Sequence, residues 1–277
     1  MKKILLIILL FVLNFLPVFA KTDRTSAEYL KNKKHLSVMN PVAESTAQRI
    51  IAKILKKKVG GGDYKVRFSA YTLSSMRKGI FKSIEVQGTD LRVEDIPVPF
   101  IRAWSLTDYN WVDITDDPIK VKTDMAFEYY MELTEDSINS ALAQKSYQEI
   151  LDNLNKLAYP LFTMQEVKVR VLNNQLYIAM YFILPLSSNK NQKKFIVSTD
   201  FYVNDGKIGV SNINIVGNYK NISLEKVANL INIINPVSFT LRLLKENHCK
   251  GRVENVKIVD DIIQINGKIY IEKIKES

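Results

Sequence analysis

Residues 195–216 read FIVSTDFYVNDGKIGVSNINIV, two segments rich in apolar and β-branched residues on either side of Asn204-Asp205-Gly206. Asn, Asp and Gly are the residues that best adopt the left-handed backbone conformations of a tight hairpin turn. The segments 195–203 and 207–216 are therefore predicted to be antiparallel strands joined directly by this turn.

The same pattern occurs on both sides of this stretch. Alternating apolar residues around Asn173-Asn174 predict a hairpin over 167–184, and those around Asp260-Asp261 predict another over 252–272. Further strands are predicted, by the same alternation, at 64–70, 84–86, 91–93, 100–112 and 123–132.

Helices are predicted between these strands. Apolar residues at helical spacing and capping residues place them over 43–58, over 135–144 with Thr134 as N-cap, from a capping box at Ser146 and Glu149 to Pro160, and from Ser223 onward with an interruption at Pro236. Antiparallel strands with helices segregated between them indicate the α+β class rather than a parallel α/β sheet.

The N-terminus has the features of a secretory signal peptide. A positive Met1-Lys2-Lys3 precedes an apolar run over 4–16, and Val18-Phe19-Ala20 forms a small-residue cleavage signal. The run is shorter than the roughly 20 residues that span a bilayer, although an uncleaved anchor is the alternative. The expected organisation is a signal peptide at 1–20, a polar linker at 21–42 and a single domain at 43–277.

The heavy use of Ile, Lys and Asn indicates an AT-rich bacterial genome, so an exported protein is expected to be periplasmic or secreted. The chain carries a formal net charge of +10 and a single cysteine, Cys249, so it cannot form an internal disulfide. A basic excess outside the cytosol favours a transient encounter with an anionic membrane surface or with polyanionic envelope polymers. Nucleic acid is not expected as a partner, because no aromatic-basic RNA motif or zinc-finger spacing occurs.

No convincing catalytic group is found in the sequence. His248 and Cys249 are adjacent, which rarely lets a base face its nucleophile, and two ligands are too few for a metal site. The acidic clusters at Asp113, Asp116 and Asp117 and at Asp260-Asp261 fall where turns are predicted. The Gly60-Gly61-Gly62 run follows a helix and lacks the Lys-Ser/Thr of a phosphate loop. We expect no enzyme activity, no metal and no cofactor.

Large apolar residues are unusually frequent in the predicted strands. They provide either an ordinary core or the lining of an adaptable acyl-chain cavity, for which flexible Met and aromatic side chains are well suited. The candidate lipid-binding residues are Trp104, Trp111, Met125, Phe127, Tyr129, Met131, Met180, Phe182 and Phe201.

The order of these elements resembles the LmeA-like phospholipid-binding domain, a bacterial branch of the tubular lipid-binding (TULIP) superfamily. The residues that carry the resemblance are the helix 43–58, Met76-Arg77-Lys78-Gly79, Ile84-Glu85-Val86-Gln87-Gly88, Glu132-Leu133-Thr134 with Ile138, Ala141 and Leu142, Asn204-Asp205-Gly206, Asn235-Pro236 and the hairpin 253–267. The resemblance implies a strongly curved antiparallel β-sheet wrapped around long helices, an elongated TULIP-like domain that holds lipid tails.

Two functions from different classes follow. The first is a non-enzymatic protein that binds phospholipid or a related amphiphile in an apolar groove, for lipid transport or envelope maintenance. The second is an envelope structural or interaction module with a solid core and a basic docking surface. For the first, the basic side chains Lys56, Lys57, Lys58, Arg77 and Lys78 are predicted to form one membrane-facing rim, or else the lysines merely complement the dipole of a helix C-terminus.

Overall fold

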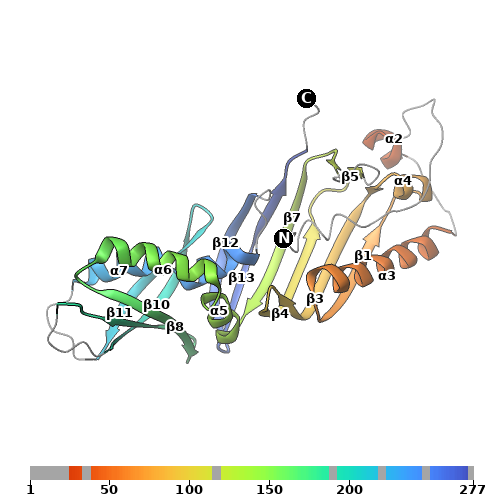
Figure 1. Cartoon of the computed structure of the whole chain (residues 1–277). Helices are drawn as coiled ribbons and strands as arrows, with labels where there is room; N and C mark the ends of the chain where they lie inside the picture. Colours follow the sequence, from red (N-terminus) through yellow and green to blue (C-terminus); the bar gives the residue numbers. More distant parts are fainter. Residues whose placement is uncertain are drawn as a thin grey trace.

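Two antiparallel sheets lie one beyond the other along an elongated molecule (Figure 1). The computed structural model describes residues 25–32, 39–113, 120–186, 192–217, 223–244 and 250–273. Helices and antiparallel strands occur throughout, which confirms the predicted α+β class. The predicted signal peptide at 1–20 lies outside the described residues and stays a prediction.

The larger sheet has six strands in the order β1-β3-β4-β7-β13-β12, and each neighbouring pair is antiparallel. Helix α3 packs along β1, and a small sheet, β2-β5-β6, is built from the chain between β1 and β7. The elements are α2 (Ala27–Asn32), α3 (Met39–Val59), β1 (Asp63–Ser69), α4 (Leu73–Arg77), β2 (Ile80–Phe81), β3 (Ser83–Val93), β4 (Ile96–Ser105), β5 (Asn110–Asp113), β6 (Lys120–Val121), β7 (Met125–Leu133), β12 (Lys250–Val259) and β13 (Ile262–Ile271).

The smaller sheet has four strands in the order β11-β10-β9-β8, and helices cover the apolar face of this sheet. Its opposite face carries mostly half-exposed and exposed residues, as expected for an antiparallel sheet with one solvated side. The elements are α5 (Glu135–Leu142), α6 (Lys145–Ala158), β8 (Thr163–Leu172), β9 (Gln175–Ile183), β10 (Lys193–Asn204), β11 (Lys207–Val216), α7 (Leu224–Ile234) and α8 (Pro236–Leu244).

The core follows the two periodicities of the sequence. Strand β7 buries every second residue from Met125 to Leu133, and β3 and β4 also alternate, each with one shift of phase near its middle. Helix α3 buries Ala47, Ile51 and Leu55, which are spaced four residues apart, in the same core. The apolar face of the larger sheet is therefore continuous from the helix-covered edge at β1 to the middle strands.

All three hairpin turns predicted from the sequence are confirmed. Each has two central residues with positive φ, the conformation that Asn, Asp and Gly tolerate best: Asn173 and Asn174, Asp205 and Gly206, Asp260 and Asp261.

Two of these turns also hold the sheets together. The amide of Asn174 donates to Asp261 Oδ1 at 2.8 Å, and the amide of Asp261 donates to Asn174 Oδ1 at 3.1 Å. The third turn reaches the larger sheet through Val253 N, which donates to the carbonyl oxygen of Gly206 at 3.1 Å. The hairpin residues thus serve both the local turns and the junction between the sheets.

Side chains from two helices and from the break between α7 and α8 form hydrogen bonds with outward-facing backbone groups of three edge strands. Asn139 of α5 accepts from Val169 N at 2.9 Å and donates to Val169 O at 3.0 Å on β8. On β1, Gln48 of α3 donates to Phe68 O at 3.2 Å. On β11, Asn235 donates to Ile208 O at 3.0 Å. At these points the backbone hydrogen bonds of the sheet edge are satisfied by packed helices rather than by water.

Replacing Asn139 by alanine should therefore destabilise the protein. Two hydrogen bonds would be lost and both polar groups of Val169 would be left without their partner, at a cost of about 2 kcal/mol. Urea denaturation measures the change, and the amide of Val169 should exchange its hydrogen faster. Asn153, an exposed asparagine on α6, supplies the control, because its replacement by alanine should leave both quantities near the parent values.

Several local predictions need correction. The strands predicted at 84–86 and 91–93 are parts of the single strand β3, and the strand predicted at 100–112 is divided between β4 and β5. Residues 25–32 are not a loose linker, because α2 buries Leu30 and is fixed by Lys31, which pairs with Asp108 at 2.8 Å. Helix α3 begins at Met39, before the predicted residue 43. Helix α6 begins at Lys145 without a side-chain cap, so Ser146 and Glu149 do not form the predicted capping box. The N-caps Thr134 and Ser223 are confirmed.

Candidate ligand-binding groove

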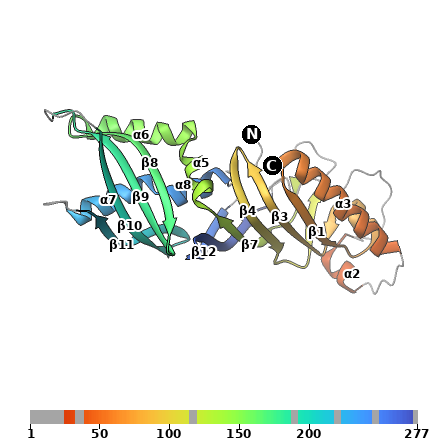
Figure 2. The ribbon, with the colours of Figure 1, turned by 90° about the horizontal axis from the view of Figure 1, so that it is seen from below.

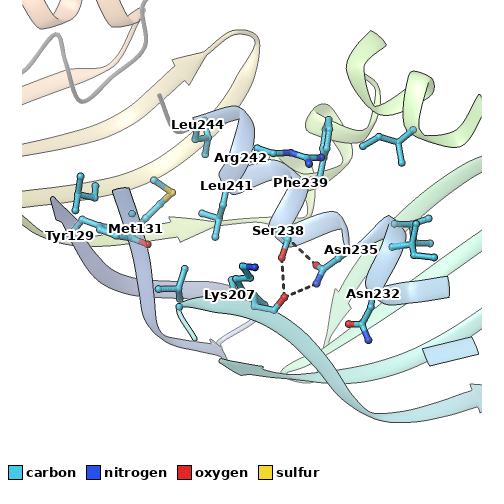
Figure 3. A pocket seen from close by; sticks show the side chains of 18 of the residues that line it. Tyr129, Met131, Lys207, Asn232, Asn235, Ser238, Phe239, Leu241, Arg242 and Leu244 are labelled. Carbon is cyan, nitrogen blue, oxygen red and sulfur yellow. Dashed lines mark hydrogen bonds between the residues drawn. The ribbon is translucent and has the colours of Figure 1, made fainter. Parts of the chain in front are cut away.

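A partly open cavity of about 570 Å³ lies where the two sheets meet (Figure 3). Its floor comes from β4, β7, β12 and β13 of the larger sheet, its roof from α7 and α8, and its rim from the β10–β11 turn. Most of the lining side chains are apolar, and the most exposed belong to the rim and to the end of α7. The structure thus places an apolar groove at the junction of the sheets.

The floor is produced by strand alternation and register. Tyr129 and Met131 point from β7 to its buried face, and Ile101 of β4 lies directly opposite Met131. On the other side of β7, Ile269 of β13 belongs to the same face and also lines the groove. Four lining residues from three strands therefore make one apolar surface.

The roof depends on the break between α7 and α8. Asn235 sits at this break, where its side chain accepts from Ser238 N at 3.1 Å and so caps the first turn of α8. Its amide nitrogen donates to Ile208 O, and Ser238 Oγ donates to the same oxygen at 3.0 Å. The break is thereby attached to β11, and Leu241 and Leu244 of α8 are directed over the floor.

Tyr147 of α6 supports this roof from behind. Its hydroxyl donates to the carbonyl oxygen of Ile234, the last residue of α7, at 3.0 Å, and its ring meets Phe239 edge-on with centroids 4.8 Å apart. Burial raises the pKa of the Tyr147 hydroxyl, which therefore stays a neutral donor. Helices α6, α7 and α8 are in this way joined at one point.

The floor of the groove is uncharged, whereas two exposed lining residues are cations. Burial, with a smaller contribution from Glu254, raises the pKa of Tyr129 to about 12, so the floor is uncharged at neutral pH. Lys207, next to the β10–β11 turn, and Arg242, on α8, both line the groove and are exposed, and the Arg242 guanidinium lies 5.3 Å from the ring centroid of Phe239. Among the described residues neither cation pairs with a carboxylate. An apolar interior with two exposed cations among its lining residues suits an amphiphile with an anionic head.

The nine candidate residues do not form one site. Only Tyr129 and Met131 line the groove. Met125 and Phe127 share their face of β7 but are packed in the core, and Met180 is buried in the smaller sheet. The others are half-buried in separate places: Trp104 and Trp111 near the opposite end of the larger sheet, Phe182 and Phe201 in the smaller one.

The predicted basic rim is also corrected. Lys56, Lys57 and Lys58 are exposed at the C-terminal end of α3, where Lys56 pairs with Asp63 at 3.2 Å. Arg77 and Lys78 follow Ala70, whose amide donates to Glu44 near the other end of α3. Glu44 and Lys56 are twelve residues apart, about 18 Å along a helix. The five charges therefore form two separate groups.

Sequence reasoning missed most of the roof. The apolar spacing of Leu241 and Leu244 predicted a helix, and Asn235-Pro236 predicted its start, but nothing in the sequence indicated which strands this helix covers. The helix pair Leu224–Leu244 is long and apolar enough to cross a membrane, while half of its most apolar window is buried inside the protein. A core helix has the same properties, and here it roofs the groove.

No alternative chemical centre is assembled in the described part of the chain. It contains no cluster of three His, Cys, Asp or Glu side chains suited to a metal ion. Asp260 and Asp261 occupy a hairpin turn, in agreement with their prediction. His35, Asp116, Asp117, His248 and Cys249 lie outside the described residues.

Fold and groove together define an α+β protein of two antiparallel sheets with an apolar groove at their junction. In comparisons with known proteins, no protein-family model, curated protein or solved structure matches this chain.

Proposed function

We propose that the protein binds a phospholipid or a related anionic amphiphile in the groove between its sheets. The observation that carries the proposal is an apolar cavity of about 570 Å³ whose lining includes two exposed cations, Lys207 and Arg242. This volume lies within the range of about 300–1,000 Å³ that is usual for small-molecule sites. Each buried CH₂ group of an acyl chain contributes about 0.8 kcal/mol, so few polar contacts are needed.

The location of the protein, its family relation and its biological role are part of the same proposal. The leader 1–20 and the basic composition favour a periplasmic or secreted, non-enzymatic protein that meets anionic membranes. The relation to LmeA-like domains and the TULIP superfamily is proposed on the order of elements, including the apolar helices and terminal hairpin that border the groove. In this role the protein transports lipid or maintains the envelope.

Filling the groove tests the proposal. Replacing Leu241, which is half-buried in the roof, by tryptophan should reduce uptake of a fluorescent phospholipid from vesicles at least about tenfold, or about 1.4 kcal/mol. The added ring occupies the space that an acyl chain would take. Native mass spectrometry of the purified parent protein should show bound lipid, and the variant should retain less.

Ile50→Trp is the matched control, because Ile50 is an exposed apolar residue on α3, away from the groove. Both variants should keep the parent circular dichroism spectrum. If the parent is repeatedly recovered lipid-free and takes up none from vesicles, the groove is not a lipid site, and a structural envelope module with a basic docking surface becomes the better account.

A further inference from the structure

Six large apolar side chains are exposed at the end of the smaller sheet that is remote from the larger sheet. They come from the end of α6, the segment leading into β8, the segment after β9, the end of β11 and the start of α7, and they are between 42% and 87% exposed. We call them the distal apolar end: Leu157, Tyr159, Leu161, Leu186, Val216 and Leu224.

Strand register shows that these five segments lie together. The first residue of β8, Thr163, lies opposite the last residue of β9, Ile183. Near the start of β10, Lys193 lies opposite Phe182, and Ile196 lies opposite Val216. Figure 2 shows the free ends of α6, β11 and α7 on the side away from the larger sheet.

This concentration differs from ordinary exposure of apolar residues. Single exposed apolar side chains are normal on a soluble surface, whereas a contiguous patch marks an interaction surface. The most exposed members are Leu157 at 87% and Leu186 at 75%. Burial against a partner would remove this exposed apolar surface from water.

Exposed lysines accompany the patch. Lys156 precedes Leu157 on α6, Lys193 begins β10, and Lys226 lies in the first turn of α7. The exposed acids Asp152 and Glu225 belong to the same two helices, so the end is cation-rich without being exclusively basic. A distal apolar end that includes a tyrosine and has exposed lysines on the same segments matches the water–lipid interface of an anionic membrane.

We propose that the distal apolar end docks into the interfacial region of an anionic lipid bilayer. A second copy of the chain is a poorer occupant, because a twofold contact would oppose the lysines of two molecules that each carry a formal net charge of +10. Docking is separate from binding in the groove. Strand β10 spans Lys193–Asn204 between the two places, about 36 Å at the usual rise per residue.

Vesicle binding of the purified protein tests the proposal. The combined variant Leu157→Gln, Leu161→Gln, Leu186→Gln should bind vesicles containing phosphatidylglycerol at least about tenfold more weakly than the parent. The matched control Ile50→Gln, Leu106→Gln, Leu172→Gln changes exposed apolar residues elsewhere, Leu172 being at the other end of β8, and should bind like the parent. Every variant has the same N-terminal segment, including its apolar run over 4–16, so a difference in vesicle binding between variants arises from the substitutions.

A charge variant and a depth probe complete the experiment. Lys156→Gln, Lys193→Gln, Lys226→Gln together should remove the preference for phosphatidylglycerol over phosphatidylcholine vesicles, while the same change at Lys56, Lys57 and Lys58 should not.

Leu161→Trp should add a blue-shifted emission, absent from the parent, that brominated lipid quenches. Equal binding by the apolar variant and its control, or an added tryptophan emission that brominated lipid leaves unquenched, overturns the proposal. The proposal is also overturned if the parent is a dimer in solution and the apolar variant is a monomer. The distal apolar end would then be an interface between copies of the chain.

The groove variant separates this surface from the proposed function. Leu241→Trp should bind vesicles like the parent even where it no longer takes up lipid, because Leu241 lines the groove from α8, which is attached to the start of β11, at the other end of the smaller sheet. If Leu241→Trp weakens vesicle binding as much as the distal substitutions do, then membrane association depends on the groove and the distal end has no docking role of its own.

Discussion

Replacing Phe127 by aspartate should leave the protein unfolded at room temperature. Phe127 is 3% exposed in the middle of β7, between Ser105 of β4 and Ile269 of β13. Loss of the ring alone costs about 4 kcal/mol in a packed core. The unpaired carboxylate adds several kcal/mol, while a whole domain is stable by only about 5–15 kcal/mol. Circular dichroism and a urea titration should show no cooperative transition.

Phe182→Asp provides the comparison, since sequence reasoning treated the two phenylalanines alike. Phe182 is half-buried on β9 and lies directly opposite Lys193 of β10, which can pair with the new carboxylate. We expect a loss of about 2 kcal/mol with the fold retained. A folded Phe127→Asp protein of parent stability would show that the β7 face is not the core described here.

Gly267→Ala should destabilise the protein by about 3 kcal/mol through overpacking. A methyl group at Gly267 would lie 2.1 Å from the carbonyl oxygen of Arg252 and 2.9 Å from the Cα of Val253, both backbone atoms of β12. Backbone cannot move aside as a side chain end can, so β12 must shift away from β13. Since β12 contributes to the groove floor, lipid uptake should fall in parallel with the melting temperature.

Gly61→Ala is the control for this change. Gly61 is exposed, has no atom within 4 Å of an added methyl group, and adopts no left-handed conformation. Its melting temperature should equal that of the parent or rise slightly, because alanine restricts the unfolded chain. Equal melting temperatures for the two alanine variants would contradict the close approach of β12 to β13.

Local features of the fold were predictable from the sequence because their causes are local. The turn at Asp205-Gly206 follows from residues that tolerate positive φ, and the N-caps Thr134 and Ser223 follow from side chains that accept backbone hydrogen bonds. The capping box at Ser146 failed since α6 continues directly from the turn after α5. The order of strands was not predictable, because β7 pairs with β13 across more than a hundred residues of chain.

The same limit applies to the groove. Alternation correctly placed Tyr129 and Met131 on one face of a strand, but it could not distinguish them from Met125 and Phe127 on that same face. What separates lining from core is the position of α8 above the strand, and that position is fixed by contacts of Asn235 with β11. A site made between two sheets has no contiguous signal in the chain.

The hydrogen bonds between helix side chains and the edge strands also affect the tendency of the protein to aggregate. An open edge strand is a template to which a foreign strand can add, the first step of amyloid-like aggregation and of domain swapping. At Val169, Phe68 and Ile208 that template is already occupied, because Asn139, Gln48 and Asn235 hold the outward backbone groups. A newly arriving strand would have to displace packed helices before it could form its first hydrogen bonds at these points. The asparagines and the glutamine therefore oppose strand addition at these points as well as stabilising the fold.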